Sequence, residues 1–302
     1  MKQFLLKSAI FCFIITVCFF LFWIVLCSNR CETLKIPQGK NIALFGNSHI
    51  ECAVNDSILK NSFNWGRSAE QMEFIYCKVK LLKRYNPQLD TIIIGYDNRL
   101  LNQSVSTECH SGLCSPYFYD IYELNDVKKI LCNSSYSYIE SHISHPFGWF
   151  KISDFIKTFF YNSKSIKDLP NLGGYINLNR NKLSEDINRN INAKYKAESY
   201  SNLSIYFLDK TISFCDKNNI KIMFLCPPQH KKCVFDSMNY KKFYAEKYNK
   251  ITFLDYRDMA LHDSCFSDLH HLNHKGAKIF SEYLEKKVLH KNNYNNNHNS
   301  LN

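Results

Sequence analysis

The feature that most constrains the fold of this chain is a set of short apolar runs, each followed by a turn. Such runs occupy residues 41–45, 91–95 and 221–226, and weaker ones lie at 62–65 and 251–255. Short, nearly continuous apolar runs are typical of strands buried on both faces of a parallel sheet. The sequence therefore predicts a sheet with a covered face on each side.

Helical periodicity separates these runs. In residues 68–85 apolar side chains recur three and four positions apart, and the Asn-Pro pair that follows ends the pattern. A second helix is predicted at 203–216, and a third begins after His274. This alternation of strands and helices indicates an α/β fold with a parallel sheet.

The N-terminal segment predicts a membrane anchor. Residues 8–27 form a run of twenty residues without a charge, which is long enough to cross a bilayer as a helix. Lys2 and Lys7 precede this run, which favours a cytoplasmic N-terminus and an extracytoplasmic body. A cleaved signal peptide is the alternative, but its apolar region usually spans only about 7–15 residues. We therefore expect a single-pass transmembrane helix.

These patterns divide the chain into three parts. Residues 1–30 would hold the cytoplasmic stub and the anchor, residues 31–289 the α/β domain, and the Asn-rich residues 290–302 a disordered tail. Within the domain, residues 101–195 interrupt the alternation and are too long for a simple connection. We expect them to form an insertion or cap that is rich in aromatic side chains.

Composition narrows the function classes. The net charge is +11, but the Lys and Arg residues are scattered, so nucleic-acid binding is not expected. Among the 13 cysteines, Cys109 with Cys114 and Cys226 with Cys233 are the candidate disulfides of an oxidising compartment. The cysteines and histidines lack the spacing of a zinc site, so no metal is expected.

Polar motifs follow the predicted strands. GNSH at 46–49 comes after the first strand, NWG at 64–66 after the second and GYDN at 95–98 after the third, while DLHH at 268–271 precedes the last helix. In an open parallel sheet, ligands bind at the carboxyl ends of the strands. We therefore expect these motifs to meet in one site.

The residue types in these motifs favour nucleophilic catalysis. A serine hydroxyl is a poor nucleophile until a base takes its proton, and His271 can be that base for Ser48. Asp268 can then hold the imidazole in the productive tautomer. Backbone N–H groups of Ser48 and Gly66, with the side-chain amide of Asn98, can stabilise an oxyanion.

The neighbouring residues have plainer interpretations. His49 is expected to be a turn residue, His270 and His274 solvated neighbours, and Asp97 a loop cap. His270 and His271 compete for the role of the base, and the Leu-Asn pair after His271 favours His271.

Together the motifs resemble those of the SGNH (GDSL-like) hydrolase superfamily. GNSH at 46–49 is similar to its first block, NWGRSA at 64–69 to its second and DLHHLNHKG at 268–276 to its Asp-x-x-His block. The chain departs from the family pattern at Asn47, where Asp is usual, and at 95–98, where Gly-x-Asn-Asp is usual.

The resemblance implies a flavodoxin-like α/β fold, a parallel sheet flanked by helices. It implies a triad of Ser48, Asp268 and His271, an oxyanion hole of Ser48, Gly66 and Asn98, and no cofactor or metal. The expected function is a membrane-anchored serine esterase or O-acyltransferase acting on acyl esters, here acetyl esters, of exported carbohydrate. The alternatives are a non-catalytic envelope protein that binds or assembles polysaccharide and a lipase-like esterase. The oligomeric state stays open.

Overall fold

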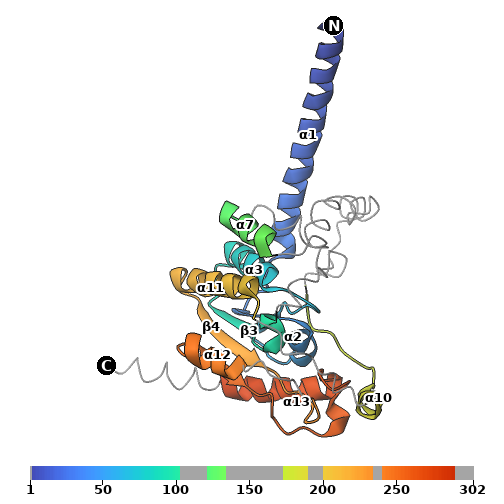
Figure 1. The fold of residues 1–302 in the computed structure, drawn as a ribbon, viewed down its shortest axis with the longest axis vertical. Helices are drawn as coiled ribbons and strands as arrows, with labels where there is room; N and C mark the ends of the chain where they lie inside the picture. The colour runs from blue at the N-terminus through green and yellow to red at the C-terminus, as the bar shows by residue number, and fades with distance from the viewer. Residues whose placement is uncertain (1, 103–120, 134–172, 190–199, 234–239, 290–302) are drawn as a thin grey trace, which may run out of the picture.

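The structure is a computed structural model of the 302-residue chain. It describes residues 2–102, 121–133, 173–189, 200–233 and 240–289, which are the coloured parts of Figure 1.

The described strands form one parallel sheet of five strands in the order β2-β1-β3-β4-β5. They are β1 (Ile42–Phe45), β2 (Ser62–Asn64), β3 (Thr91–Gly95), β4 (Lys221–Cys226) and β5 (Thr252–Asp255). This is the flavodoxin-like order of a doubly wound sheet. The predicted α/β fold with a parallel sheet flanked by helices is confirmed.

The described helices are α1 (Lys2–Thr33), α2 (Ser48–Ala53), α3 (Met72–Tyr85), α4 (Asn98–Leu101), α7 (Leu124–Asn133), α10 (Leu183–Asn188), α11 (Asn202–Lys217), α12 (Tyr240–Lys247) and α13 (His274–Leu284). A 3₁₀ turn covers Asp263–Cys265, and a π-helical turn covers Glu285–Leu289. The helix expected from residue 68 begins only at Met72, because Ala69 has a φ of 56° and Gln71 is the extended N-cap. Helical periodicity continues into that turn, so it could not locate the start.

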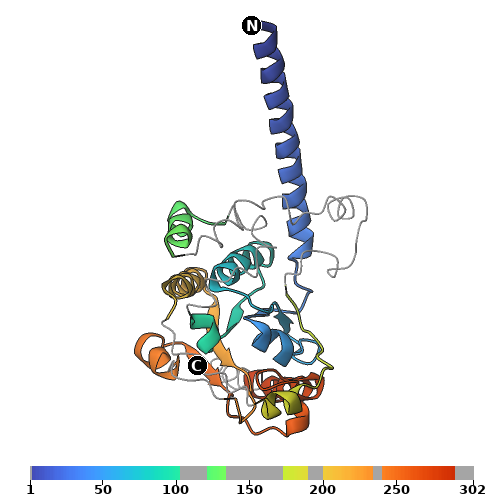
Figure 2. The same cartoon turned by 45° about the vertical axis from the view of Figure 1, so that its right-hand side comes forward.

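Helices cover both faces of the sheet (Figures 1 and 2), and an apolar cluster lies between the helices and each face. Alternate strand residues such as Phe45, Ile94 and Phe224 pack with the inward faces of α3 and α11. The residues between them, such as Leu44 and Ile93, pack with α2 and α13 on the other face. Strands buried on both faces explain why their sequences are apolar throughout.

Helix α1 extends away from the body of the protein (Figure 1). Large apolar side chains along it are exposed, from Phe4 at 73% to Leu21 at 56%. Within the part of the chain that the structure describes, no helix is both long enough and apolar enough to cross a membrane. The transmembrane helix predicted from residues 8–27 is thus not supported by the structure.

The chain that leaves α1 is held against the body by Asn86, the C-cap of α3. The Asn86 side chain accepts a hydrogen bond from the Ile36 backbone N–H at 2.6 Å and donates one to the Leu34 carbonyl oxygen, also at 2.6 Å. Leu34 and Asn86 are buried. These two bonds fix the direction in which the chain enters β1.

The predicted domain boundaries stay predictions. Most of the insertion expected at 101–195 and all of the tail at 290–302 lie outside the described residues. The described parts of the insertion carry α7 and α10.

One predicted disulfide is wrong. Cys226 and Cys233 are both free. The Cys226 thiol lies beside the Tyr240 hydroxyl, whereas the Cys233 thiol is 3.1 Å from Nδ1 of His270. The two cysteines were paired because they are close in the sequence, but closeness in the sequence does not show the direction of their side chains. Cys109 and Cys114 lie outside the described residues.

A buried ion pair stabilises the turn between β2 and α3. Nζ of Lys78 lies 2.5 Å from Oε1 of Glu70, and both side chains are fully buried. Lys78 also donates a hydrogen bond to the Trp65 carbonyl oxygen at 3.2 Å. Burial raises the pKa of Glu70, and the charge of Lys78 opposes that rise. Removing Lys78 alone would therefore leave an uncompensated carboxyl group in the core.

We predict that Lys78→Met lowers the free energy of unfolding by about 3–5 kcal/mol, the usual cost of breaking one half of a buried pair. The double variant Lys78→Met/Glu70→Gln should lose less than the single variant, because no charge is left unpaired. Urea unfolding followed by circular dichroism measures both. Arg84→Met, at an exposed position of the same helix, is the control and should change stability by less than about 0.5 kcal/mol. Equal losses for the single and double variants would contradict the prediction.

Candidate active site

Ser48 is the first residue of α2 and lies at the carboxyl end of β1. Asn47 is the N-cap, and its side chain accepts the His49 backbone N–H at 2.9 Å. Two residues further along, the Ile50 side chain fills the space beside Gly46 and Gly95. A Cβ atom at either glycine would lie 2.5–2.6 Å from Ile50 Cγ1. The two glycines therefore let α2 start directly at the sheet edge.

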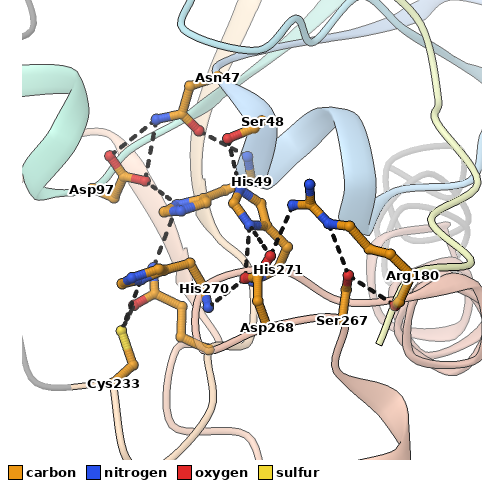
Figure 3. Close-up of polar contacts among 11 residues, drawn as sticks. Asn47, Ser48, His49, Asp97, Arg180, Cys233, Ser267, Asp268, His270 and His271 are labelled. Atoms are coloured by element: carbon orange, nitrogen blue, oxygen red, sulfur yellow. Dashed lines mark hydrogen bonds and ion pairs between the residues drawn. The ribbon is translucent and has the colours of Figure 1, made fainter. Parts of the chain in front are cut away.

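The structure brings Ser48, His271 and Asp268 together (Figure 3). Nε2 of His271 is 2.8 Å from Oγ of Ser48. Nδ1 of the same ring is 2.8 Å from Oδ1 and 3.0 Å from Oδ2 of Asp268. Each distance is that of a hydrogen bond, so a hydroxyl, an imidazole and a carboxyl group form one hydrogen-bonded chain.

Asp268 is held as a carboxylate by its surroundings. The backbone N–H groups of His270 and His271 each donate to its Oδ1 at 2.9 Å. Burial acts to raise the pKa of Asp268, but the hydrogen bond and charge of His271 outweigh it and hold that pKa below its ordinary value. An ionised Asp268 keeps the His271 proton on Nδ1, which leaves the Nε2 lone pair facing Ser48.

Arg180 is a residue of this site that the sequence did not indicate. One guanidinium nitrogen lies 2.8 Å from Oδ2 of Asp268, and its Nε donates to Ser267 Oγ at 3.2 Å. Backbone bonds fix the segment around it, from Lys182 N–H to Ser267 O at 2.7 Å and from His274 N–H to Leu178 O at 3.1 Å. Arg180 lies far from any motif, and nothing in the sequence links it to Asp268.

The same segment packs on the second motif. Gly174 N–H donates to Gly66 O at 2.9 Å. Gly173 has a φ of 117°, and a Cβ there would lie 2.4 Å from the Trp65 carbonyl oxygen. Only glycine allows this approach. Part of the predicted insertion therefore belongs to the site.

The predicted oxyanion groups are not all aligned. The Gly66 N–H donates to Oδ1 of Asn64 at 2.8 Å, so the structure gives it a partner within the protein. Nδ2 of Asn64 donates to the carbonyl oxygens of Ile50 at 3.0 Å and Val54 at 2.7 Å, which fixes the amide orientation. Asn98 begins α4, and no hydrogen bond joins it to Ser48 among the described contacts. Ser48 itself contributes the first backbone N–H of α2.

His49 differs from the turn residue that we expected. It is buried, with 3% exposure, and its Nδ1 lies 2.5 Å from Oδ2 of Asp97. Asp97 is the predicted cap, since it accepts the Leu100 N–H at 2.9 Å at the start of α4. The sequence shows both residues, but only the pairing of β1 with β3 brings them together.

The structure places His271, and not His270, against Ser48. His270 turns the other way, where its Nδ1 is 3.1 Å from the Cys233 thiol. Burial, with the charge of Arg99, lowers the pKa of His270 to about 3. His270 is partly exposed, so the expectation of a solvated neighbour holds only in part, whereas His274 is exposed as expected. No group of side chains among the described residues is suited to hold a metal ion.

Comparison with known proteins gives two results at the sequence level. A protein-family model that carries no description of function matches residues 123–293, which is more than half of the chain, so the chain belongs to that family. No curated protein matches the chain.

Three of the solved structures that match this chain illustrate how weak the similarity is. A proposed platelet activating factor from Streptococcus pneumonia has a TM-score of 0.41 at 12% identity, over 91% of this chain and 98% of its own. A proposed acylhydrolase from Bacteroides fragilis has a TM-score of 0.38 at 13% identity, over 88% and 94%. A GDSL-like lipase from Bacteroides thetaiotaomicron has a TM-score of 0.38 at 13% identity, over 87% and 95%. Similarity at this level adds nothing to the geometry of the site.

The class follows from the protein's own features. A parallel sheet in the order β2-β1-β3-β4-β5 carries a serine after β1 and an Asp-x-x-His turn before the last α-helix. The serine and the histidine meet at 2.8 Å. This arrangement agrees with the resemblance to the SGNH (GDSL-like) hydrolase superfamily that the sequence motifs carry.

We predict that Asn64→Asp lowers the free energy of unfolding by about 2–4 kcal/mol at pH 7, because a carboxylate cannot donate to the two carbonyl groups that the amide now satisfies. The loss should shrink in acid, where a protonated carboxyl group can donate one bond. Urea titrations at pH 7 and pH 4 measure it. Asn61→Asp, an exposed position just before β2, is the matched control. A loss at Asn64 no larger than that of the control would contradict the hydrogen-bonding scheme.

Proposed function

We propose that this protein is a serine hydrolase or acyltransferase that acts on carboxylic esters. The observation that carries the proposal is the hydrogen-bonded chain from Ser48 Oγ through His271 to Asp268, with distances of 2.8 Å at both ends of the imidazole. A serine with no base beside it would be inert, and this serine has one in reach without any rearrangement.

In the proposed reaction, Nε2 of His271 takes the proton of Ser48 Oγ as that oxygen attacks the ester carbonyl. Asp268 stabilises the imidazolium that forms. The same proton then passes to the leaving alcohol oxygen, and an acyl group remains on Ser48. Water or an acceptor hydroxyl, deprotonated by His271, then attacks the acyl-enzyme. The bond between the acyl group and Ser48 Oγ breaks, the acid or the new ester leaves, and His271 returns the proton to Ser48 Oγ.

We favour an acetyl ester of exported carbohydrate as the substrate. The side chains around the triad are polar or charged, among them His49, Asp97, Arg180 and Gln229. Such surroundings suit a short acyl group on a hydroxylated molecule better than a long alkyl chain, which needs apolar walls.

One observation favours the alternative of a non-catalytic protein that binds polysaccharide. The N–H of Gly66, one of the expected oxyanion donors, is used within the protein by Asn64. Loss of one such donor typically lowers kcat by about 10²–10³. Labelling of Ser48 separates the two functions, because a binding protein needs no reactive serine.

We also propose that α1 attaches the body to a membrane, with the body on the extracytoplasmic side. The exposed apolar side chains between Phe4 and Leu21 support this, since soluble surfaces rarely present so many together. Lys2 and Lys7 support the orientation.

For the triad, we predict that a fluorophosphonate probe labels Ser48, that Ser48→Ala abolishes labelling and ester hydrolysis, and that His271→Ala lowers kcat by at least about 10³. Asp268→Asn should lower kcat by about 10⁴, because the wrong tautomer of His271 is then favoured. His270→Ala should be comparatively mild.

His274→Ala, at an exposed position, is the control and should keep the wild-type rate. Labelling that survives in Ser48→Ala would show that another residue reacts. A wild-type protein that is folded but never labelled would favour the binding function.

For α1, we predict that the full-length chain stays in the membrane fraction after alkaline carbonate washing, because apolar burial in the bilayer does not depend on salt or charge. Protease added to intact cells or spheroplasts should digest the body. Recovery of a soluble chain that starts near Ser28 would contradict attachment.

A further inference from the structure

A second histidine–carboxylate pair lies beside the triad (Figure 3). His49 directly follows Ser48 in α2, and its ring centroid is 5.2 Å from that of His271. Its Nδ1 is hydrogen-bonded to Asp97, which is itself held by the Leu100 N–H at 2.9 Å and by Nδ2 of Asn47 at 3.4–3.5 Å. This pair is therefore as firmly oriented as His271 and Asp268, yet the proposed reaction does not use it.

The ring proton of His49 lies on Nδ1, the nitrogen that faces Asp97. Burial lowers the pKa of His49, so its ring is neutral, and the ionised Asp97 keeps the single ring proton on Nδ1. Nε2 is then a hydrogen-bond acceptor. It is buried and has no partner among the described residues. Buried polar atoms normally have partners, so an unpartnered one on an oriented ring points to a ligand.

His49 lines a small cavity together with its partner Asp97, the polar residues Asn98, Gln229 and Tyr240, and two arginines, Arg99 and Arg257. The cavity has a volume of about 10 Å³, which is room for a group about the size of a water molecule. Asn98 also lines the cavity, and its Oδ1 is likewise buried without a partner among the described residues. Two buried acceptors without partners, on residues that line so small a cavity, favour a group that donates hydrogen bonds. A hydroxyl group has the size and the donor, and its oxygen is compatible with the arginines of the same lining.

We propose that this cavity is a subsite for a hydroxyl group of the substrate, read by Nε2 of His49. The substrate class is then an ester whose alcohol part carries a second, neighbouring hydroxyl group, as in a monoester of a vicinal diol. The inference rests on the proposed function of Ser48 and adds the feature that the site recognises. His49 is thus a specificity-determining residue.

A pair of nearly isosteric esters tests the subsite. 2-Hydroxyethyl acetate and propyl acetate differ by a hydroxyl in place of a methyl group at the same position. The wild-type protein should favour the hydroxy ester by at least about tenfold in kcat/KM, because a site built to bind a hydroxyl group leaves its polar atom unpaired with the other ester.

Two replacements of His49 separate recognition from structure. His49→Gln can keep an acceptor oxygen near the position of Nε2, whereas His49→Asn can keep only the contact with Asp97. His49→Asn should therefore reduce the preference to within about twofold of unity, and His49→Gln should retain part of it. His274→Gln, at an exposed position, is the control and should keep the full preference.

The outcomes are distinguishable from failure of the proposed function. If the fluorophosphonate probe does not label Ser48 in the wild type, the proposed function fails and the subsite fails with it. If Ser48 is labelled but both esters react equally, only the subsite is overturned. If kcat/KM falls by the same factor for both esters in both His49 variants, His49 has a structural role, and the subsite is overturned as well.

Discussion

The contact of Ile50 with Gly46 and Gly95 is the constraint on which the site depends. The ends of β1 and β3 lie side by side, and a side chain at either glycine would occupy the space that Ile50 fills. Because Ile50 packs there, α2 begins immediately after the strand. Ser48 and His49, in its first turn, are therefore held at the carboxyl edge of the sheet, where a parallel sheet places its ligands.

Asp268 and His271 lie in a loop between residues 265 and 276, which hydrogen bonds and close packing hold in place. Asn273 caps α13 and donates to the carbonyl oxygens of Ser264 and Phe266, and a Cβ at Gly276 would lie 2.2 Å from the Cys265 carbonyl oxygen. This close packing leaves the Asp268 and His271 side chains little freedom. Arg180 adds a contact from a segment about ninety residues away. Orientation of this kind is what a base needs to act without reorganisation.

Local sequence was sufficient for most of the elements and for the contact between Ser48 and His271. The apolar runs at 91–95 and 221–226 coincide with β3 and β4, and Ser48 and His271 meet as their motifs suggested. The start of α3 was misplaced because Ala69 adopts a positive φ that periodicity cannot show. His49 was misjudged because a histidine after a strand looks the same in sequence whether it faces solvent or a buried carboxylate.

The sequence by itself determined that the fold is a parallel α/β sheet and which residue types stand at its edge, because burial on both faces demands apolar strands and leaves polar residues only where they end. The tertiary structure decided how those residues are paired. It assigned the Gly66 N–H to Asn64, joined His49 to Asp97 and brought Arg180 to Asp268. In each of these contacts, packing sets the direction of the atoms that meet. That packing involves segments that are distant in the sequence, and no local sequence pattern shows that they lie together.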